Sequence, residues 1–94
     1  MDGIVRWAAE NKVDFVIVAP DDPLCLGMVD ALAEQGIPAF GPRKNAAIIE
    51  GSKVFSKNLM KKYGIPTAAY ETFDDYDEAV KYLQTADMPI VVKA

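Results

Sequence analysis

The chain has 94 residues, of which 51% are apolar and 26% are charged, so it can form one small globular domain or a piece of a larger one. Its net charge of −4 excludes the general basic field that holds nucleic acid, and no apolar run approaches the roughly 20 residues of a membrane span, so we expect a cytoplasmic protein that contacts neither nucleic acid nor membrane. One cysteine and no histidine exclude an internal disulfide, Ser-His catalysis and a conventional zinc site with histidine ligands.

The chain begins with the pattern of a helix followed by a strand. Residues 1–11 suit a short helix, because Ile4, Val5, Trp7 and Ala8 occur there with charged residues between them. Val13–Ala19 is a nearly continuous β-branched run, which is typical of a strand covered on both faces in a parallel sheet. Pro20 ends that run.

The next segment predicts a helix that returns the chain to a second strand. Asp22 is the expected N-cap, Pro23 the first helical residue and Gly36 the end. The expected buried face consists of Leu24, Met28, Val29 and Leu32. Cys25 is expected to be a small buried apolar residue. Ala39–Phe40 then forms a strand parallel to the first, which completes a βαβ unit.

The carboxyl ends of these strands are the expected ligand side of the sheet. They lead into the turns 19–22 and 41–43. Asp21 and Asp22 also have a purely structural interpretation, since aspartate commonly caps the helix that follows. Both interpretations stay open at this point.

The triplet Gly51-Ser52-Lys53 marks the boundary between two halves of the chain, which we place near Glu50. A short helix over Asn45–Glu50 leads into it. Ser52 is a good N-cap for a second helix from about Ser52 to Tyr63, which Gly64 ends in a left-handed conformation.

Lys53 is unusual because a cation in the first turn faces the positive end of the helix dipole. A bound phosphate would make this position favourable, since it would accept from free N–H groups and pair with the ammonium. The alternative is that Lys53, Lys57 and Lys61 form a solvated stripe along the helix.

The last third predicts a strand, a helix and a strand. The strands are Thr67–Phe73 and Pro89–Ala94, and Asp74 is the expected cap of a helix that reaches Leu83. Lys93 ends an apolar strand, so its ammonium must meet a polar cleft, or else water at the end of the chain. The chain stops one residue later without a turn or cap, as a piece of a longer protein does.

Several blocks at consistent spacing make the chain recognisable. They are Phe15–Leu24, Gly27, Val29–Ala31, Phe40–Pro42, Ala46-Ala47, Glu50–Lys53, Phe55, Lys57, Gly64–Ala68, Tyr70 and Pro89–Ala94. In these blocks the chain resembles the phosphoribosylamine–glycine ligase (glycinamide ribonucleotide synthetase) family of the ATP-grasp superfamily.

The resemblance implies an α/β fold in which a parallel-sheet, Rossmann-like (pre-ATP-grasp) half is followed by the first βα elements of an ATP-grasp domain. Residues 1–50 match the C-terminal part of the family's amino-terminal, substrate-binding domain. Residues 51–94 match the start of its ATP-grasp domain.

The resemblance also implies an ATP-dependent carbon-nitrogen ligase of purine biosynthesis. Such an enzyme uses ATP and Mg²⁺ (or Mn²⁺) to join glycine to 5-phosphoribosylamine through enzyme-bound glycyl phosphate. By this analogy Lys53 and Lys93 contact the nucleotide phosphates, which explains both unusual lysines. Pro20 and Asp21 match a Gly-Pro-Glu segment near the phosphoribosylamine site, although Ala19 replaces the glycine and Asp21 the glutamate.

The family's glycine-rich loops and its metal-binding carboxylates fall outside these 94 residues. The resemblance therefore assigns no catalytic and no metal-binding residue to the chain, and we expect the isolated chain to be inactive. We also expect it to self-associate through apolar faces that have lost their cover.

Two other interpretations remain. One is a different ATP-grasp ligase, biotin carboxylase-like or carboxyaminoimidazole-type, because these enzymes share the lysine pair and the helix, Gly-Ile-Pro, strand order. The other is a non-catalytic binding or assembly module whose apolar strands are covered by a partner.

Overall fold

A computed structural model describes all 94 residues as six helices and two short strands. In chain order the elements are α1 (Asp2–Glu10), β1 (Val16–Ile17), α2 (Asp21–Leu26), α3 (Met28–Glu34), β2 (Ala39–Phe40), α4 (Lys44–Gly51), α5 (Lys53–Lys62) and α6 (Tyr76–Thr85). The two strands pair in parallel, with Val16 opposite Ala39 and Ile17 opposite Phe40. The predicted α/β class and the parallel pairing are confirmed.

The hydrophobic core lies entirely in the first half of the chain. Its nine buried residues fall between Val5 and Ala47, and Leu32 at its centre is 0% exposed. The predicted inner face of the helical segment is confirmed, because Leu24, Met28, Val29 and Leu32 are all buried. Cys25 is half-buried and packs against this core.

The prediction that the first strand is covered on both faces is wrong. Val18 is buried and Val16 packs against the core, whereas the alternate residues Phe15 and Ile17 are exposed. Ile17 and its neighbour across the ladder, Phe40, are each 69% exposed. The core residues cover one face of the sheet only, so the β-branched run carries an inner and an outer set of side chains.

The predicted single helix from Asp22 to Gly36 is two helices. Gly27 separates α2 from α3 with a left-handed φ of 95°, which a glycine adopts at no steric cost. Pro20, and not Asp22, is the residue before α2, and no side chain caps this end. The predicted end is confirmed, since Gly36 N–H donates to Ala33 O and Ile37 N–H to Leu32 O in a Schellman arrangement.

Gly41 follows β2 where the chain passes close to the core. Its φ is 147°, and a Cβ added there would lie 2.8 Å from Leu24 Cδ2 and 3.3 Å from Val18 O. Both the conformation and the lack of space require glycine at this position. The turn after β2 is therefore held against the first turn of α2.

The boundaries of α5 follow the prediction. The Ser52 hydroxyl accepts from Phe55 N–H at 3.1 Å and caps the helix. At the other end Gly64 has a φ of 64°, and Ile65 N–H donates to Met60 O. This is a second Schellman arrangement, as the Gly-Ile-Pro sequence indicates.

The two strands predicted in the last third are wrong, because residues 67–73 and 89–94 are irregular. No other segment of the chain forms a ladder with them, and an extended run is not a strand without a hydrogen-bonded neighbour. The predicted helix between them is α6, although Asp75 and not Asp74 precedes it.

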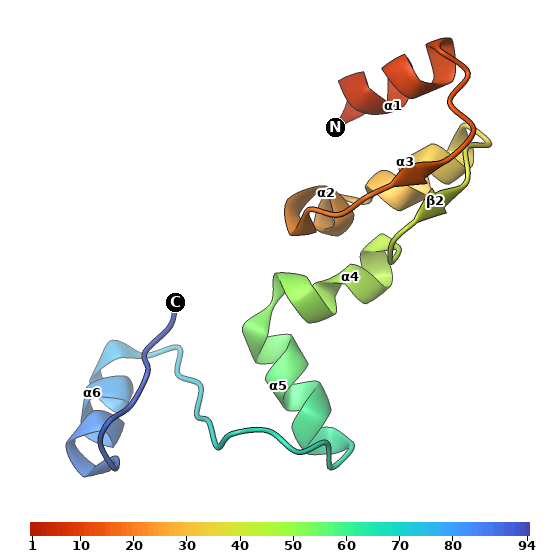
Figure 1. Ribbon diagram of the computed structural model, residues 1–94. Helices are drawn as coiled ribbons and strands as arrows, with labels where there is room; N and C mark the ends of the chain where they lie inside the picture. The colour runs from red at the N-terminus through yellow and green to blue at the C-terminus, as the bar shows by residue number, and fades with distance from the viewer.

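The molecule is elongated, with extents of 58 × 27 × 19 Å and a radius of gyration of 18.7 Å, whereas a compact chain of this length has about 12 Å. Figure 1 shows α6 and the C-terminal segment standing away from the first four helices. α6 contacts none of the other helices or strands, and Ser56 is the only buried residue after Ala47. None of the helices has the length and apolar character needed to cross a membrane.

Candidate functional site

The carboxyl ends of β1 and β2 lie on the same side of the sheet, because the strands are parallel. The turn after β1 carries the two predicted residues Pro20 and Asp21, and both are exposed. Asp21 and Asp22 occupy the first turn of α2, where a negative charge is favourable beside the positive end of the helix dipole.

A hollow of about 430 Å³ connects this turn to the start of α5. Its lining consists of Asp21, Asp22, Cys25, Lys44, Ile48, Glu50, Gly51 and Ser52. We call it the acidic hollow, because three carboxylates face one lysine. Its charge suits a group that presents N–H or O–H donors better than it suits a phosphate.

The wall between α2 and α4 in this hollow is unusually close. A Cβ on Gly51 would lie 2.6 Å from Cys25 Sγ, and the Cys25 thiol donates to Ala47 O at 3.6 Å. Sequence reasoning missed this contact. Its only signal was a glycine at the end of a helix, directly before the capping serine.

Lys53 opens α5 directly after the capping serine. Its side chain is exposed, and it makes no ion pair, since the only ion pair of the structure joins Arg43 to Asp30. The ammonium is therefore unpaired, and the preceding residue, Ser52, lines the acidic hollow.

Lys93 lies beside a second hollow of about 480 Å³, formed by the start of α5, α6 and the C-terminal segment. The lining residues are Val54, Glu71, Thr72, Phe73, Asp74, Ala79, Tyr82, Leu83, Ile90, Val91, Val92, Lys93 and Ala94. We call it the apolar hollow. The rings of Phe73 and Tyr82 pack there with centroids 5.2 Å apart. Val54, the residue after Lys53, borders the same hollow as Lys93.

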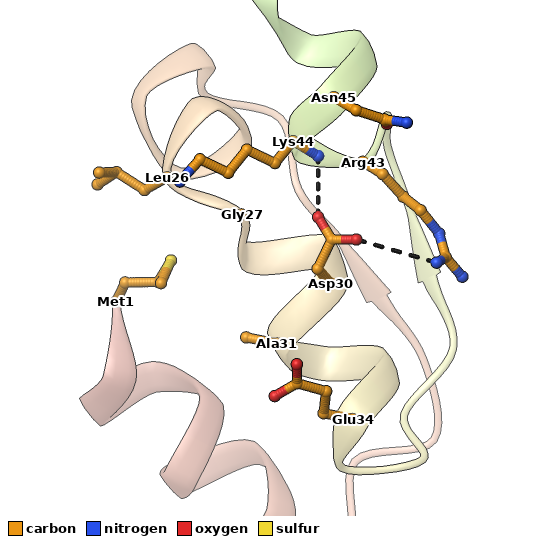
Figure 2. Close-up of a pocket in the computed structure, with 9 residues that line it drawn as sticks. All are labelled: Met1, Leu26, Gly27, Asp30, Ala31, Glu34, Arg43, Lys44 and Asn45. Carbon is orange, nitrogen blue, oxygen red and sulfur yellow. Dashed lines mark hydrogen bonds and ion pairs between the residues drawn. The ribbon is translucent and has the colours of Figure 1, made fainter.

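A third hollow, of about 660 Å³, is lined by none of the four predicted residues. Figure 2 shows Asp30 of α3 at its centre, between Arg43 and Lys44. The carboxylate accepts from the Lys44 backbone N–H at 2.8 Å and lies 3.9 Å from Arg43 Nη1. The Asp30 carboxylate thus binds the N-terminal end of α4. This contact was not predicted from the sequence.

Metal ligands do not gather in this chain. No group of three His, Cys, Asp or Glu side chains is placed to hold a metal ion. The acidic hollow has carboxylates on two different elements, and these do not converge in that way.

Comparison with known proteins gives two family matches that meet between Glu50 and Gly51, next to the Ser52 cap. Residues 1–50 match the family model described as phosphoribosylglycinamide synthetase, N domain. Residues 51–94 match the model described as phosphoribosylglycinamide synthetase, ATP-grasp (A) domain.

Curated bacterial proteins named phosphoribosylamine–glycine ligase are similar to almost the whole chain. A protein of Listeria monocytogenes is 56% identical over 92 residues, which is 98% of this chain and 22% of the relative. Relatives in Allochromatium vinosum and Caldanaerobacter subterraneus are 48% and 46% identical over 98% and 100% of the chain, and again 22% of each relative is covered. The chain therefore spans about a fifth of the length of these relatives.

Proposed function

Because the chain belongs to the phosphoribosylglycinamide synthetase family, we propose that it forms part of an ATP-dependent ligase that joins glycine to 5-phosphoribosylamine. In this proposal the products are glycinamide ribonucleotide, ADP and phosphate, and the glycine carboxylate is activated as glycyl phosphate. The names of the similar Listeria, Allochromatium and Caldanaerobacter proteins support this choice over other ATP-grasp ligases.

The observation that carries the proposal is that Lys53 stands in the chain between two residues that line hollows of different character. Ser52 lines the acidic hollow and Val54 lines the apolar hollow. An apolar hollow with aromatic walls suits a nucleobase, and an acidic one suits the amine or hydroxyl groups of a substrate. A phosphoryl group passing between them would lie beside Lys53.

Lys93 supplies the second cation of the proposed nucleotide site. It borders the apolar hollow and makes no ion pair. Two ammonium groups can offset the charge that develops on a transferring phosphoryl group. Pro20 and Asp21 would then contact phosphoribosylamine from the turn that borders the acidic hollow.

Mg²⁺ has no site among these residues, since no suitable set of ligands gathers in the chain. The contribution of the chain is to hold the phosphate-facing cations and one wall of each substrate pocket.

The same family supports a division into two domains. We propose that residues 1–50 are part of a Rossmann-like, pre-ATP-grasp domain and residues 51–94 the first elements of an ATP-grasp domain. The confinement of the core to residues 5–47 and the two family matches support this boundary.

A chimera tests the function directly. The sequence of this chain replaces the matching 92 residues of the Listeria relative, and ADP release is measured with glycine, phosphoribosylamine and ATP. Lys53→Ala and Lys93→Ala should each lower kcat/KM for ATP by about 10-fold to 150-fold, the value of one charge-assisted hydrogen bond.

The matched control is Lys61→Ala, which removes an exposed lysine from the same helix and should leave kcat/KM nearly unchanged. Equal effects of Lys53→Ala and Lys61→Ala would refute the phosphate role of Lys53. Bicarbonate-dependent turnover in place of glycine-dependent turnover would favour the other ATP-grasp ligases.

We also propose that the isolated chain associates with a second copy of itself. The outer face of its sheet carries Phe15, Ile17 and Phe40, and both edges of the two-stranded sheet are unpaired. Phe40→Lys should shift sedimentation velocity profiles toward the monomer, and a concentration-independent monomer of the unchanged chain would contradict the proposal.

A further inference from the structure

Lys57 differs from the other two lysines of its helix face. Lys53 and Lys61 are exposed, whereas Lys57 is half-buried. The Lys57 ammonium donates to Thr67 Oγ1 and lies 5.9 Å from the centroid of the Tyr70 ring. The solvated stripe considered from the sequence therefore does not extend to Lys57.

The next residue of α5 makes a second bond to the same segment. Asn58 Oδ1 accepts from the Tyr70 hydroxyl at 2.7 Å. Two neighbouring residues of one helix thus hold two residues of the irregular segment that leads to α6. We call Lys57, Asn58, Thr67 and Tyr70 the latch.

The latch makes the only two hydrogen bonds between residues 1–65 and residues 66–94. α6 packs against no other helix or strand, and Figure 1 shows the segment after α5 running free of the first four helices on its way to α6. The placement of the C-terminal part relative to α5 therefore depends on these bonds and on Val54, the residue of α5 that lines the apolar hollow together with α6 and the C-terminal segment.

We propose that the latch consists of positioning residues, which set where Lys93 lies relative to Lys53. This inference rests on the proposed function, in which both lysines face one nucleotide. Thr67 and Tyr70 are three residues apart, which corresponds to about 10 Å along an extended chain. Two attachments at that separation restrict rotation of the C-terminal part as well as its distance.

The chemistry of the two bonds suits this role. An ammonium that donates to a hydroxyl makes a charge-assisted bond, which is stronger than a neutral one. The Tyr70 hydroxyl and the Asn58 oxygen form a directed neutral bond beside it. Loss of either bond leaves one attachment, about which the segment can pivot.

A distance measurement on the 94-residue chain tests the latch. Spin labels are placed at Lys61→Cys and Lys81→Cys, two exposed positions on α5 and α6, in a Cys25→Ser background, and pulsed electron resonance gives the distribution of distances between them. We expect one narrow distribution in the background protein. Asn58→Leu, Tyr70→Phe and Thr67→Val should each make it roughly twice as wide.

Two controls separate loss of the bond from loss of a side chain. Asn58→Asp retains an acceptor oxygen and should keep the narrow distribution. Tyr76→Phe removes a hydroxyl from an exposed tyrosine that makes no hydrogen bond and should also have no effect. A broad distribution in the background protein, or equal widths in Asn58→Leu and Asn58→Asp, would overturn the proposal.

The test is independent of the function on which the inference rests, because the distances are measured without nucleotide. In the chimera, Tyr70→Phe should raise KM for ATP about threefold or more, because misplaced cations weaken binding. An unchanged KM together with a defective Lys53→Ala variant would overturn the positioning role and leave the ligase function intact. A harmless Lys53→Ala variant with widened distances in Tyr70→Phe would overturn the proposed phosphate role of Lys53 and leave the latch.

Discussion

Gly51→Ala is the sharpest test of how the end of α4 packs against α2, because the new methyl group would clash with a single atom. The added Cβ would lie 2.6 Å from Cys25 Sγ, well inside the 3.5 Å or more of ordinary contact. The thiol has one rotatable bond, and rotation would break its contact with Ala47 O. The clash must therefore separate α2 from α4 or cost that bond.

The expected magnitude follows from two opposing terms. Alanine is a better helix former than glycine by up to about 1 kcal/mol, and overpacking costs about 1 to 3 kcal/mol. In a Cys25→Ala background the sulfur is gone, and the next neighbour is the Cβ of residue 25 at 3.7 Å, an ordinary contact. Gly51→Ala should therefore destabilise the parent chain and stabilise, or leave unchanged, the Cys25→Ala chain.

The assay is urea unfolding of the four proteins of this double-mutant cycle, followed by far-ultraviolet circular dichroism. The helix-propensity term cancels in the cycle, so the coupling free energy reports the clash alone, at about 1 to 3 kcal/mol. Gly3→Ala is the control, since nothing lies within 4 Å of the added Cβ. A coupling below about 0.5 kcal/mol would refute the reasoning.

Two further predictions concern the cap of α5 and the centre of the core. Ser52→Ala removes the acceptor for Phe55 N–H and should cost about 1 kcal/mol, seen as faster hydrogen exchange of the Phe55 amide, whereas Ser52→Asp should restore protection. Leu32→Ala empties a fully buried position and should lower the free energy of unfolding by about 2 to 5 kcal/mol in urea titrations. Leu26→Ala, at a mostly exposed position, should cost under about 0.5 kcal/mol, and similar losses at both positions would contradict the assigned core.

Features that depend on neighbouring residues could be predicted from the sequence. The Ser52 cap and the Gly36 and Gly64 helix ends need only a few consecutive residues, and all three are present. The break at Gly27 also had a local signal, a glycine inside a helical pattern. It was missed because the apolar spacing continues through it without interruption.

Features that depend on distant partners could not be predicted in the same way. Residues 67–73 and 89–94 have the composition of strands, but a strand exists only where another segment hydrogen-bonds to it. The Asp30 bond to Lys44 and the Cys25 contact with Gly51 join residues 14 and 26 positions apart. Their side chains carry no pattern that reveals a partner so far along the chain.

The geometry around Lys53 is fixed by the core on one side and by a few side-chain contacts on the other. Before it, α2 and α4 both contribute to the core through the buried Leu24 and Ala47, and Gly51 lies close to Cys25. After it, the latch ties α5 to the segment that leads to α6. Each bond of the latch is worth only about 0.5 to 3 kcal/mol, and the latch lies outside the buried cluster that ends at Ala47. Changes at residue 58 or 70 should therefore alter the spacing of the two lysines while the first half of the chain stays folded, which separates positioning from stability at this site.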